Sequence, residues 1–350
     1  MHRLIGSIFI GLMLVVSGCS PTEADIAEDY REVQSLIDKY REDFAPLNAA
    51  AELLDAMESR FPNSKYTHVG LGRLSYKLGH RVNYEYSEES LDIAKEYFKQ
   101  AIAIDPDFFD AYYYGSYAYL VSGDLDTALE MAEDAKRLEP ESFYLDLLLA
   151  QIARTVEKPL EVIEHSLAAL GRAEVDEKGV DEAQGLLSDA YTAAGDYVVA
   201  EQYYNKVINT NPVSAFARSN YSRFLSNHSK DYDKAIQQAT VSLSLKDYGV
   251  AHKTLAYAYY KKAVQLMWTV QKHDEALVNF SHASHHNRSS SNIYYGLGSA
   301  YFVTGFRDRD VKQIKLGEIH LQRAVELSPN NEPALEQLAE VKKVLEKYGK

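Results

Sequence analysis

Cysteine is almost absent from this chain of 350 residues. Cys19 is the only one, so no disulfide can form within one molecule. Basic residues are also scarce relative to acidic ones, and the formal net charge is -14. This balance lacks the basic face that nucleic acids require, and it disfavours a polybasic contact with anionic lipid head groups. Beyond residue 18, no apolar stretch is long enough to cross a membrane.

Motifs of catalysis are missing as well. The chain has no Gly-rich phosphate loop and no Gly-x-Ser-x-Gly elbow, so we expect neither an enzyme nor a bound cofactor. The one metal-like cluster is His282, His285 and His286. His282 and His286 are spaced to share a helical face, but histidines near the end of a helix are also favoured by the helix dipole. Because no third ligand accompanies them, the sequence predicts no metal site.

The N-terminal segment has the parts of a secretory signal. Arg3 and the amino terminus supply a positive end, and the apolar run that follows is too short to span a bilayer. The run leads into Val16-Ser17-Gly18-Cys19, which resembles the lipobox of bacterial lipoproteins. In that family the Cys thiol is acylated with fatty acid such as palmitate and becomes the new first residue. The alternative is an ordinary secretory signal with a chance cysteine.

The lipobox resemblance sets expectations for processing and location. It implies a signal peptide over 1–18, a lipid on Cys19 and a linker over 19–23. Ser20, in place of Asp after the cysteine, points to the outer membrane with the protein facing the periplasm. The inner membrane and the cell surface remain alternatives.

The body of the chain is periodic. Pro106 and Pro140 each follow an apolar helical pattern and lie 34 residues apart. Between them, an aromatic-rich segment from Phe109 to Tyr119 precedes a Gly123-Asp124 turn and a second segment with alanines on one face. This pattern resembles a tetratricopeptide repeat, whose period is about 34 residues.

Related patterns recur over most of the chain. The resemblance implies an all-α fold, a superhelical α-solenoid of antiparallel helix pairs, in which the last repeat is covered by a capping helix with one apolar side. We therefore predict about eight repeats and a cap, over 24–62, 63–106, 107–140, 141–176, 177–212, 213–247, 248–288, 289–329 and 330–350.

Each repeat needs small side chains where its two helices cross, because the backbones approach closely there. The predicted crossing pairs are Ser116 with Ala128, Gly72 with Ala94, Ser188 with Ala200, Ser222 with Ala235, Ala256 with Ala276, and Gly298 with Gly317.

Three repeats are longer than this pattern requires. Ala128 follows Ser116 by 12 residues, whereas the corresponding separations in the second, seventh and eighth repeats are 22, 20 and 19 residues. We expect the additional residues at the turns around 80–89, 263–272 and 306–315, and insertions on one edge often mark a binding face. The middle one carries the only tryptophan, Trp268. The alternative is that lengthened helices pack their added apolar residues on each other.

A second candidate surface is the concave groove. The chain has 27 tyrosines, and tyrosine is favoured in binding surfaces because it offers a large rigid contact area with a polar tip. Positions that line the groove in tetratricopeptide proteins correspond here to Tyr66, Arg73, Tyr76, Tyr113, Tyr117, Asp189, Arg223, Tyr257, Tyr260, Tyr295 and Phe302. Packing between helices is an equally good explanation for these side chains.

The resemblance implies a passive scaffold that binds protein partners of the cell envelope. Lipoproteins of this type help to assemble pilus secretins, export polysaccharide or organise cell-wall enzymes. The alternative is direct glycan binding, in which groove tyrosines stack on sugar rings and Asp189 or Arg223 reaches hydroxyl groups.

Overall fold

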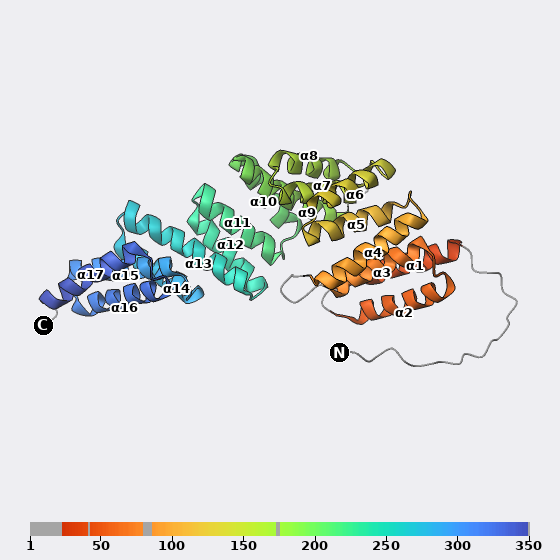
Figure 1. The fold of residues 1–350 in the computed structure, drawn as a ribbon. Coiled ribbons are helices and arrows are strands. Elements are labelled where there is room, and N and C mark those ends of the chain that lie inside the picture. Colours follow the sequence, from red (N-terminus) through yellow and green to blue (C-terminus); the bar gives the residue numbers. More distant parts are fainter. Residues whose placement is uncertain (1–22, 41–42, 80–85, 173–175, 349–350) are drawn as a thin grey trace, which may run out of the picture. The chain divides into compact units, whose positions relative to one another are not determined.

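The structure is a computed structural model that describes residues 23–40, 43–79, 86–172 and 176–348. Within these ranges, every secondary-structure element of several residues is a helix, as Figure 1 shows. The predicted all-α fold is therefore confirmed. The expected signal peptide and Cys19 lie outside the described residues. Among the helices that the structure describes, none is both long enough and apolar enough to cross a bilayer.

The chain forms two compact units, Met1–Glu141 and Ser142–Lys350. Unit 1 contains three helix pairs: α1 (Glu23–Asp38) and α2 (Ala45–Arg60), α3 (Lys65–Leu78) and α4 (Glu88–Ile104), α5 (Phe109–Ser122) and α6 (Leu125–Leu138). Unit 2 contains α7 (Phe143–Thr155) and α8 (Pro159–Gly171), α9 (Glu177–Ala194) and α10 (Tyr197–Thr210), α11 (Ala215–Phe224) and α12 (Tyr232–Leu245), α13 (Gly249–Val264) and α14 (His273–His286), α15 (Ser291–Asp308) and α16 (Val311–Leu327), and finally α17 (Glu332–Tyr348).

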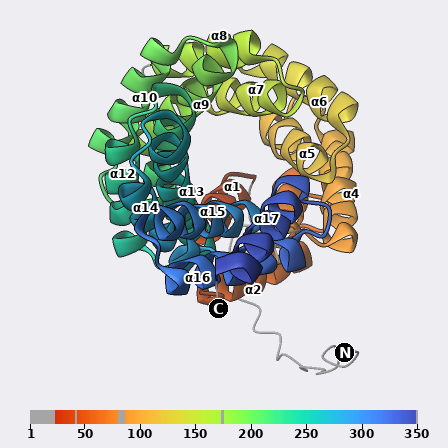
Figure 2. The same ribbon diagram turned by 90° about the vertical axis from the view of Figure 1, so that its left-hand side faces the viewer.

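Each predicted repeat range holds one of these pairs to within a residue, and α17 falls in the range predicted for the cap. Figure 2 shows that in unit 2 the first helices of the pairs, such as α7, α9, α13 and α15, lie on the inner side. The second helices, such as α8, α10, α12 and α14, lie on the outer side. The first helices of unit 2 therefore share one inner face.

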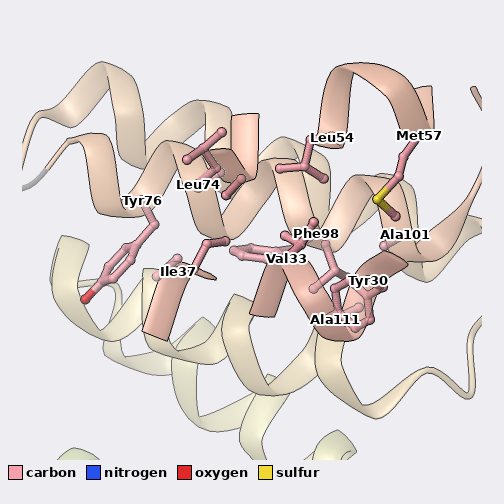
Figure 3. Close-up of a cluster of buried hydrophobic side chains, with 14 of the residues drawn as sticks. Tyr30, Val33, Ile37, Leu54, Met57, Leu74, Tyr76, Phe98, Ala101 and Ala111 are labelled. Carbon is pink, nitrogen blue, oxygen red and sulfur yellow. The ribbon is translucent and has the colours of Figure 1, made fainter. Parts of the chain in front are cut away.

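The core of unit 1 follows directly from helical periodicity. In α1 the buried residues are Ile26, Tyr30, Val33 and Ile37, which recur every three or four positions and so form one apolar stripe. This stripe packs on buried side chains of α2, α3 and α4, including Phe98, which is only 1% exposed (Figure 3). Because each helix has one such stripe, it is stable only against its neighbours.

Small residues do mark the crossing of paired helices. The hydroxyl of Ser116 donates to the carbonyl oxygen of Ala128 at 2.7 Å, and that of Ser222 donates to Ala235 O at 2.7 Å. A Cβ on Gly298 would lie 2.9 Å from the carbonyl oxygen of Gly317. These three predicted pairs are confirmed, and in each of them one backbone lies against the other helix.

The turn inside a pair repeats one local design. Gly123 and Gly195 adopt left-handed φ of 84°, and Asp124 and Asp196 then cap the second helix by accepting a hydrogen bond from the backbone N–H three residues on. The same left-handed position is taken by the non-glycine residues Glu157, Lys230, Gln271 and Arg309. Since L residues pay a steric cost there, the geometry of the turn is set by the helix pair and not by glycine alone.

The eighth repeat corrects the expectation that its additional residues lengthen the turn. Only Arg309 and Asp310 separate α15 from α16, and these helices have 18 and 17 residues against 14 and 14 for α5 and α6. Phe302 and Ile314 lie in one buried cluster. The alternative given above, in which lengthened helices pack on each other, describes this repeat.

The seventh repeat corrects both the turn and a crossing pair. Ala276 lies in a buried cluster with Ala263, whereas Ala256 shares a cluster with Ala283. The predicted pair of Ala256 with Ala276 is therefore wrong by seven residues, about two helical turns. The first helix of this repeat is longer and continues into a five-residue π-helix, Gln265–Thr269. A similar π-helix, Leu225–Ser229, follows α11 in the sixth repeat. In the sixth and seventh repeats, the wider turn of the π-helix accommodates one extra residue.

The second repeat differs from the seventh and eighth, because α3 ends at Leu78 and α4 begins at Glu88, so its additional residues lie between the two helices as predicted. A Cβ on Gly72 would meet the ring of Phe98 at 2.7 Å, so this glycine lies close against α4. Seven residues on, a Cβ added to Gly79 would lie 2.4 Å from the Cβ of Ser90. Residues 80–85 of the predicted insertion lie outside the described ranges. Among the three long repeats, the first helix is lengthened only in the seventh and eighth, where small residues recur seven positions apart, Ala256 and Ala263 in α13 and Gly298 and Gly305 in α15.

Substituting Gly298 tests the close crossing. We expect Gly298→Ala to lower the free energy of unfolding by about 1–3 kcal/mol, because the new methyl group meets backbone atoms of α16, which cannot rotate away. Urea unfolding of the full chain, followed by circular dichroism, measures this loss.

The matched control is Gly185→Ala in α9, where a Cβ would meet nothing within 4 Å. There the better helix propensity of alanine should raise stability by about 0.5–1 kcal/mol. Equal effects of the two substitutions would contradict a close crossing at Gly298.

Candidate partner-binding faces

The predicted groove residues of unit 1 lie on α3 and α5. Tyr66 packs its ring against Tyr30 of α1 at 5.5 Å and against Phe108 at 5.2 Å, measured between ring centroids. The sequence interpretation missed Tyr30 because the first repeat matches the pattern weakly. Tyr66 is half-buried and held on two sides, so its role in unit 1 is largely structural.

Arg73 does not line an accessible groove. It is 5% exposed, donates to Asp38 Oδ1 at 2.8 Å, and holds its guanidinium carbon 4.0 Å from the ring centroid of Tyr114. Nearby, Tyr30 donates its hydroxyl to Asp110 Oδ2 at 2.7 Å, and burial raises the pKa of the Asp110 carboxyl. Arg73 therefore belongs to a buried polar network that joins α1, α3 and α5.

Tyr76 is also buried, at 8% exposure. Its hydroxyl oxygen lies 2.6 Å from that of Tyr86, the two rings stack at 4.7 Å, and Tyr117 meets Tyr76 edge-on at 5.6 Å. Burial raises the pKa of Tyr76 well above its usual range, so this phenol stays neutral. The sequence analysis missed Tyr86, because it lies within the predicted insertion around 80–89, where no helical face could be assigned.

Two residues of the predicted groove in unit 1 stay partly accessible. Tyr113 stacks on Phe109 at 5.7 Å and meets Tyr114 edge-on at 4.9 Å, whereas Tyr117 contacts Tyr76. Both are half-buried. Because they follow each other by one helical turn on α5, they form a short aromatic strip, which we call the α5 strip (Phe109, Tyr113 and Tyr117).

In unit 2 the predicted residues contact different neighbours. Asp189 accepts a hydrogen bond from the hydroxyl of Tyr204 at 2.8 Å. Arg223 is exposed and donates to Asn220 Oδ1 at 3.3 Å. Tyr257 donates its hydroxyl to Asn227, across from α13 to the π-helix after α11. These contacts spread along unit 2 rather than converging on one point.

Trp268 is brought together with two of the groove residues. Its ring stacks on that of Tyr295 at 6.2 Å and meets Phe280 edge-on at 5.9 Å, while Tyr260 lies 6.1 Å from Phe280. We call these four residues the Trp268 cluster. Trp268 is 47% exposed, as is its neighbour Val270. The sequence placed Trp268 on an edge and Tyr260 and Tyr295 in the groove; the π-helix after α13 carries Trp268 to them.

Phe302, in contrast, is 8% exposed and packs in the core that α15 forms with α16 and α17. Its ring lies 6.0 Å from that of Phe306, which is 55% exposed. Phe302, which was predicted in the groove, therefore packs in the core, and Phe306, four residues later, is the exposed aromatic residue.

The histidines of unit 2 are not grouped as a metal site of three protein ligands. Over the part of the chain that the structure describes, no three His, Cys, Asp or Glu side chains are placed to hold an ion together. His282 stacks on Tyr259 at 4.9 Å. His320 lies against Tyr301 at 5.4 Å and Tyr294 at 6.0 Å, and burial lowers its pKa.

Comparison with known proteins agrees with this fold. Tetratricopeptide repeat profiles match residues 97–130, and residues 85–108 and 181–214. The chain therefore contains tetratricopeptide repeats and has the corresponding all-α fold. A comparison with curated protein sequences finds no match.

Two solved structures with a similar fold superpose over most of this chain. The C-terminal part of a TPR repeat-containing protein from Cytophaga hutchinsonii superposes with a TM-score of 0.53 at 14% identity, covering 77% of this chain and 99% of that one. Yeast Tom70 gives a TM-score of 0.50 at 15% identity, covering 97% of this chain and 68% of that one. At such identities the likeness shows the fold alone.

His320 makes stability depend on pH. Because its pKa is lowered in the folded protein, the unfolded chain binds a proton more readily, and stability falls as the pH drops through the ordinary histidine pKa of about 6.5. We expect His320→Gln, which cannot ionise, to lose less stability than the wild type between about pH 7.5 and about pH 5.5. Urea midpoints at both pH values measure this difference.

His285→Gln serves as the control, because this side chain is exposed. It should leave the wild-type pH dependence in place. A wild type and a His320→Gln variant with the same loss on acidification would refute the assignment.

Proposed function

We propose that this protein is a non-catalytic scaffold of the bacterial cell envelope that binds protein partners. Proteins built from tetratricopeptide repeats generally act as binding scaffolds rather than as enzymes. Such a scaffold works passively: stacked helix pairs hold a preformed surface, so less ordering free energy is lost on binding. The scaffold would act in the assembly of a pilus secretin, a polysaccharide exporter or a cell-wall complex.

The observation that carries the proposal is the Trp268 cluster. Trp268 leaves 47% of its surface exposed to water. A partner that covers this apolar surface gains hydrophobic free energy of binding. Tryptophan and tyrosine are the residues most enriched among binding hot spots. Here Phe280 and Tyr295 support the indole on two sides, so its position is fixed before a partner arrives. The cluster thus offers a rigid aromatic anchor.

The α5 strip is the second surface in the proposal. Tyr113 and Tyr117 are half-buried, so part of each side chain remains accessible to a partner. The buried network of Arg73 and Tyr76 beneath them fixes the backbone of α3 and α5.

Location in the envelope is supported by the sequence. Acylation of Cys19 would tether the scaffold, since each buried methylene contributes about 0.8 kcal/mol of membrane binding and two or more acyl chains give a durable anchor. Ser20 after the cysteine favours the outer membrane. We infer that the repeats face the periplasm, where an acidic body with net charge -14 is not drawn to anionic lipid.

Photocrosslinking tests the partner-binding role of the Trp268 cluster. We expect a photoreactive amino acid in place of Val270, which is exposed beside Trp268, to form a discrete protein adduct in the cells that produce the protein. Trp268→Ala in the same chain should remove most of that adduct, because truncating a hot spot costs about 2 kcal/mol or more. Gel mobility and mass spectrometry of the adduct provide the readout.

The probe at Val198, which is 72% exposed on α10, is the matched control and should give no such adduct. Adducts of equal yield from both positions would contradict a specific site. Recovery of polysaccharide alone from the Val270 probe would favour glycan binding instead.

Fatty-acid labelling tests the anchor. In cells given a clickable fatty acid, the wild-type chain should carry the label, and Cys19→Ala should lose it because no other thiol remains in the chain. Ser20→Asp is a useful companion: it should keep the label and shift the protein toward the inner membrane in fractionated cells. Equal labelling of the wild type and Cys19→Ala would remove the proposed anchor.

A further inference from the structure

A pair of histidines in unit 2 belongs to neither candidate face. His252 belongs to α13 and His286 is the last residue of α14, so the antiparallel pairing of these helices brings them together. Their Nδ1 atoms lie 3.0 Å apart, and their ring centroids lie 5.3 Å apart. The sequence pattern pointed to His282 and His286 on one helix; the structure instead pairs His286 with a residue from the preceding helix.

Asp247 orients the first member of the pair. Its Oδ1 lies 2.9 Å from Nε2 of His252, so Nε2 carries the proton and donates it to the carboxylate. This tautomer leaves a lone pair on Nδ1 of His252, directed toward His286. A carboxylate that holds the far nitrogen of a histidine is the usual outer support of a metal ligand, because it fixes the ring and makes the near nitrogen more basic.

The second member is positioned by aromatic contacts. The ring of His286 lies parallel to that of Tyr259, with an interplanar angle of 5° at 6.5 Å, and His285 meets it edge-on at 5.2 Å. Burial, and then the neighbouring histidines, lower the pKa of His286. The side chain of His252 is 37% exposed, which leaves a path from solvent.

The separation of the two nitrogens matches right-angled coordination. With metal–nitrogen bonds of about 2.0–2.1 Å, two ligands at a right angle lie about 2.9 Å apart, and two tetrahedral ligands lie about 3.4 Å apart. The observed 3.0 Å is near the first value. Imidazole ligands at right angles are typical of square-planar or octahedral Cu²⁺ and Ni²⁺.

We propose that His252 and His286 form a two-histidine site for a divalent transition metal, with Cu²⁺ and Ni²⁺ preferred over Zn²⁺. On binding, His286 changes tautomer: its Nδ1 proton leaves to solvent, its Nε2 takes up a proton from solvent, and the Nδ1 lone pairs of both residues face the ion. Since no third His, Cys, Asp or Glu joins the pair in the described part of the chain, water or a partner molecule supplies the remaining ligands. The site is independent of the scaffold role proposed above.

Titration with Cu²⁺, followed by electron paramagnetic resonance of the full-length protein, tests the site. The wild type should bind one equivalent of Cu²⁺ with higher affinity than any further Cu²⁺. The spectrum of this first equivalent should show hyperfine splitting from two imidazole nitrogens. His252→Gln and His286→Gln should each weaken this equivalent by more than about tenfold, because losing even an outer supporting residue costs about 10–100-fold. Isothermal titration with Ni²⁺ and Zn²⁺ gives the metal preference, and thermal unfolding checks that each variant is folded.

Two variants separate this pair from other histidines. His228→Gln removes a histidine of the π-helix after α11 and no proposed ligand, so it should leave the affinity unchanged. His282→Gln should also bind Cu²⁺ as the wild type does. If His252→Gln binds as tightly as the wild type, or if His282→Gln or His228→Gln weakens binding as much as His286→Gln, the proposed pair is overturned.

Discussion

The close approach of two helix backbones within each repeat is the constraint on which the rest of this structure depends. Where α15 crosses α16, only glycine fits, because a Cβ on Gly298 would reach the backbone of Gly317 and Leu321. Where α5 crosses α6, serine fits because its hydroxyl satisfies the carbonyl oxygen of Ala128 at 2.7 Å. Each crossing sets the separation of a pair, and that separation decides which aromatic side chains fill the grooves between pairs and which stay accessible.

The fold could be predicted from the sequence because its constraints are local and repeated. The crossing of Ser116 with Ala128, the turn at Gly123 and the cap at Asp124 all lie within one period, and all are present in the structure. The additional residues of the seventh and eighth repeats were predicted in the turns, and the structure places them in longer helices for a physical reason. In the eighth repeat Gly305, seven positions after Gly298, extends the close contact by two turns, so no loop is needed.

The candidate sites were harder to predict, since they depend on contacts between repeats. Helical position alone placed Arg73 in the groove, but Asp38 from another helix pair and Tyr114 from a third enclose it. The contact of Trp268 with Tyr295 depends on a π-helix over Gln265–Thr269, and no residue in that segment predicts a π-helix. The pair of His252 and His286 depends on the register between α13 and α14, and the predicted pair of Ala256 with Ala276 was seven residues out of register. In each case the chemistry of the residues was evident and their partners were not.

Amide hydrogen exchange over residues 300–320 tests the central claim most directly, because it distinguishes continued helices from an inserted loop. With α15 and α16 joined only by Arg309 and Asp310, slow exchange should extend through Asp308 on one side and resume by about Ile314, after the first unbonded amides of α16. Fast exchange over the whole stretch from Thr304 to Leu316 would contradict the account, because the added residues would then form an exposed loop and the helix crossing would end at Gly298.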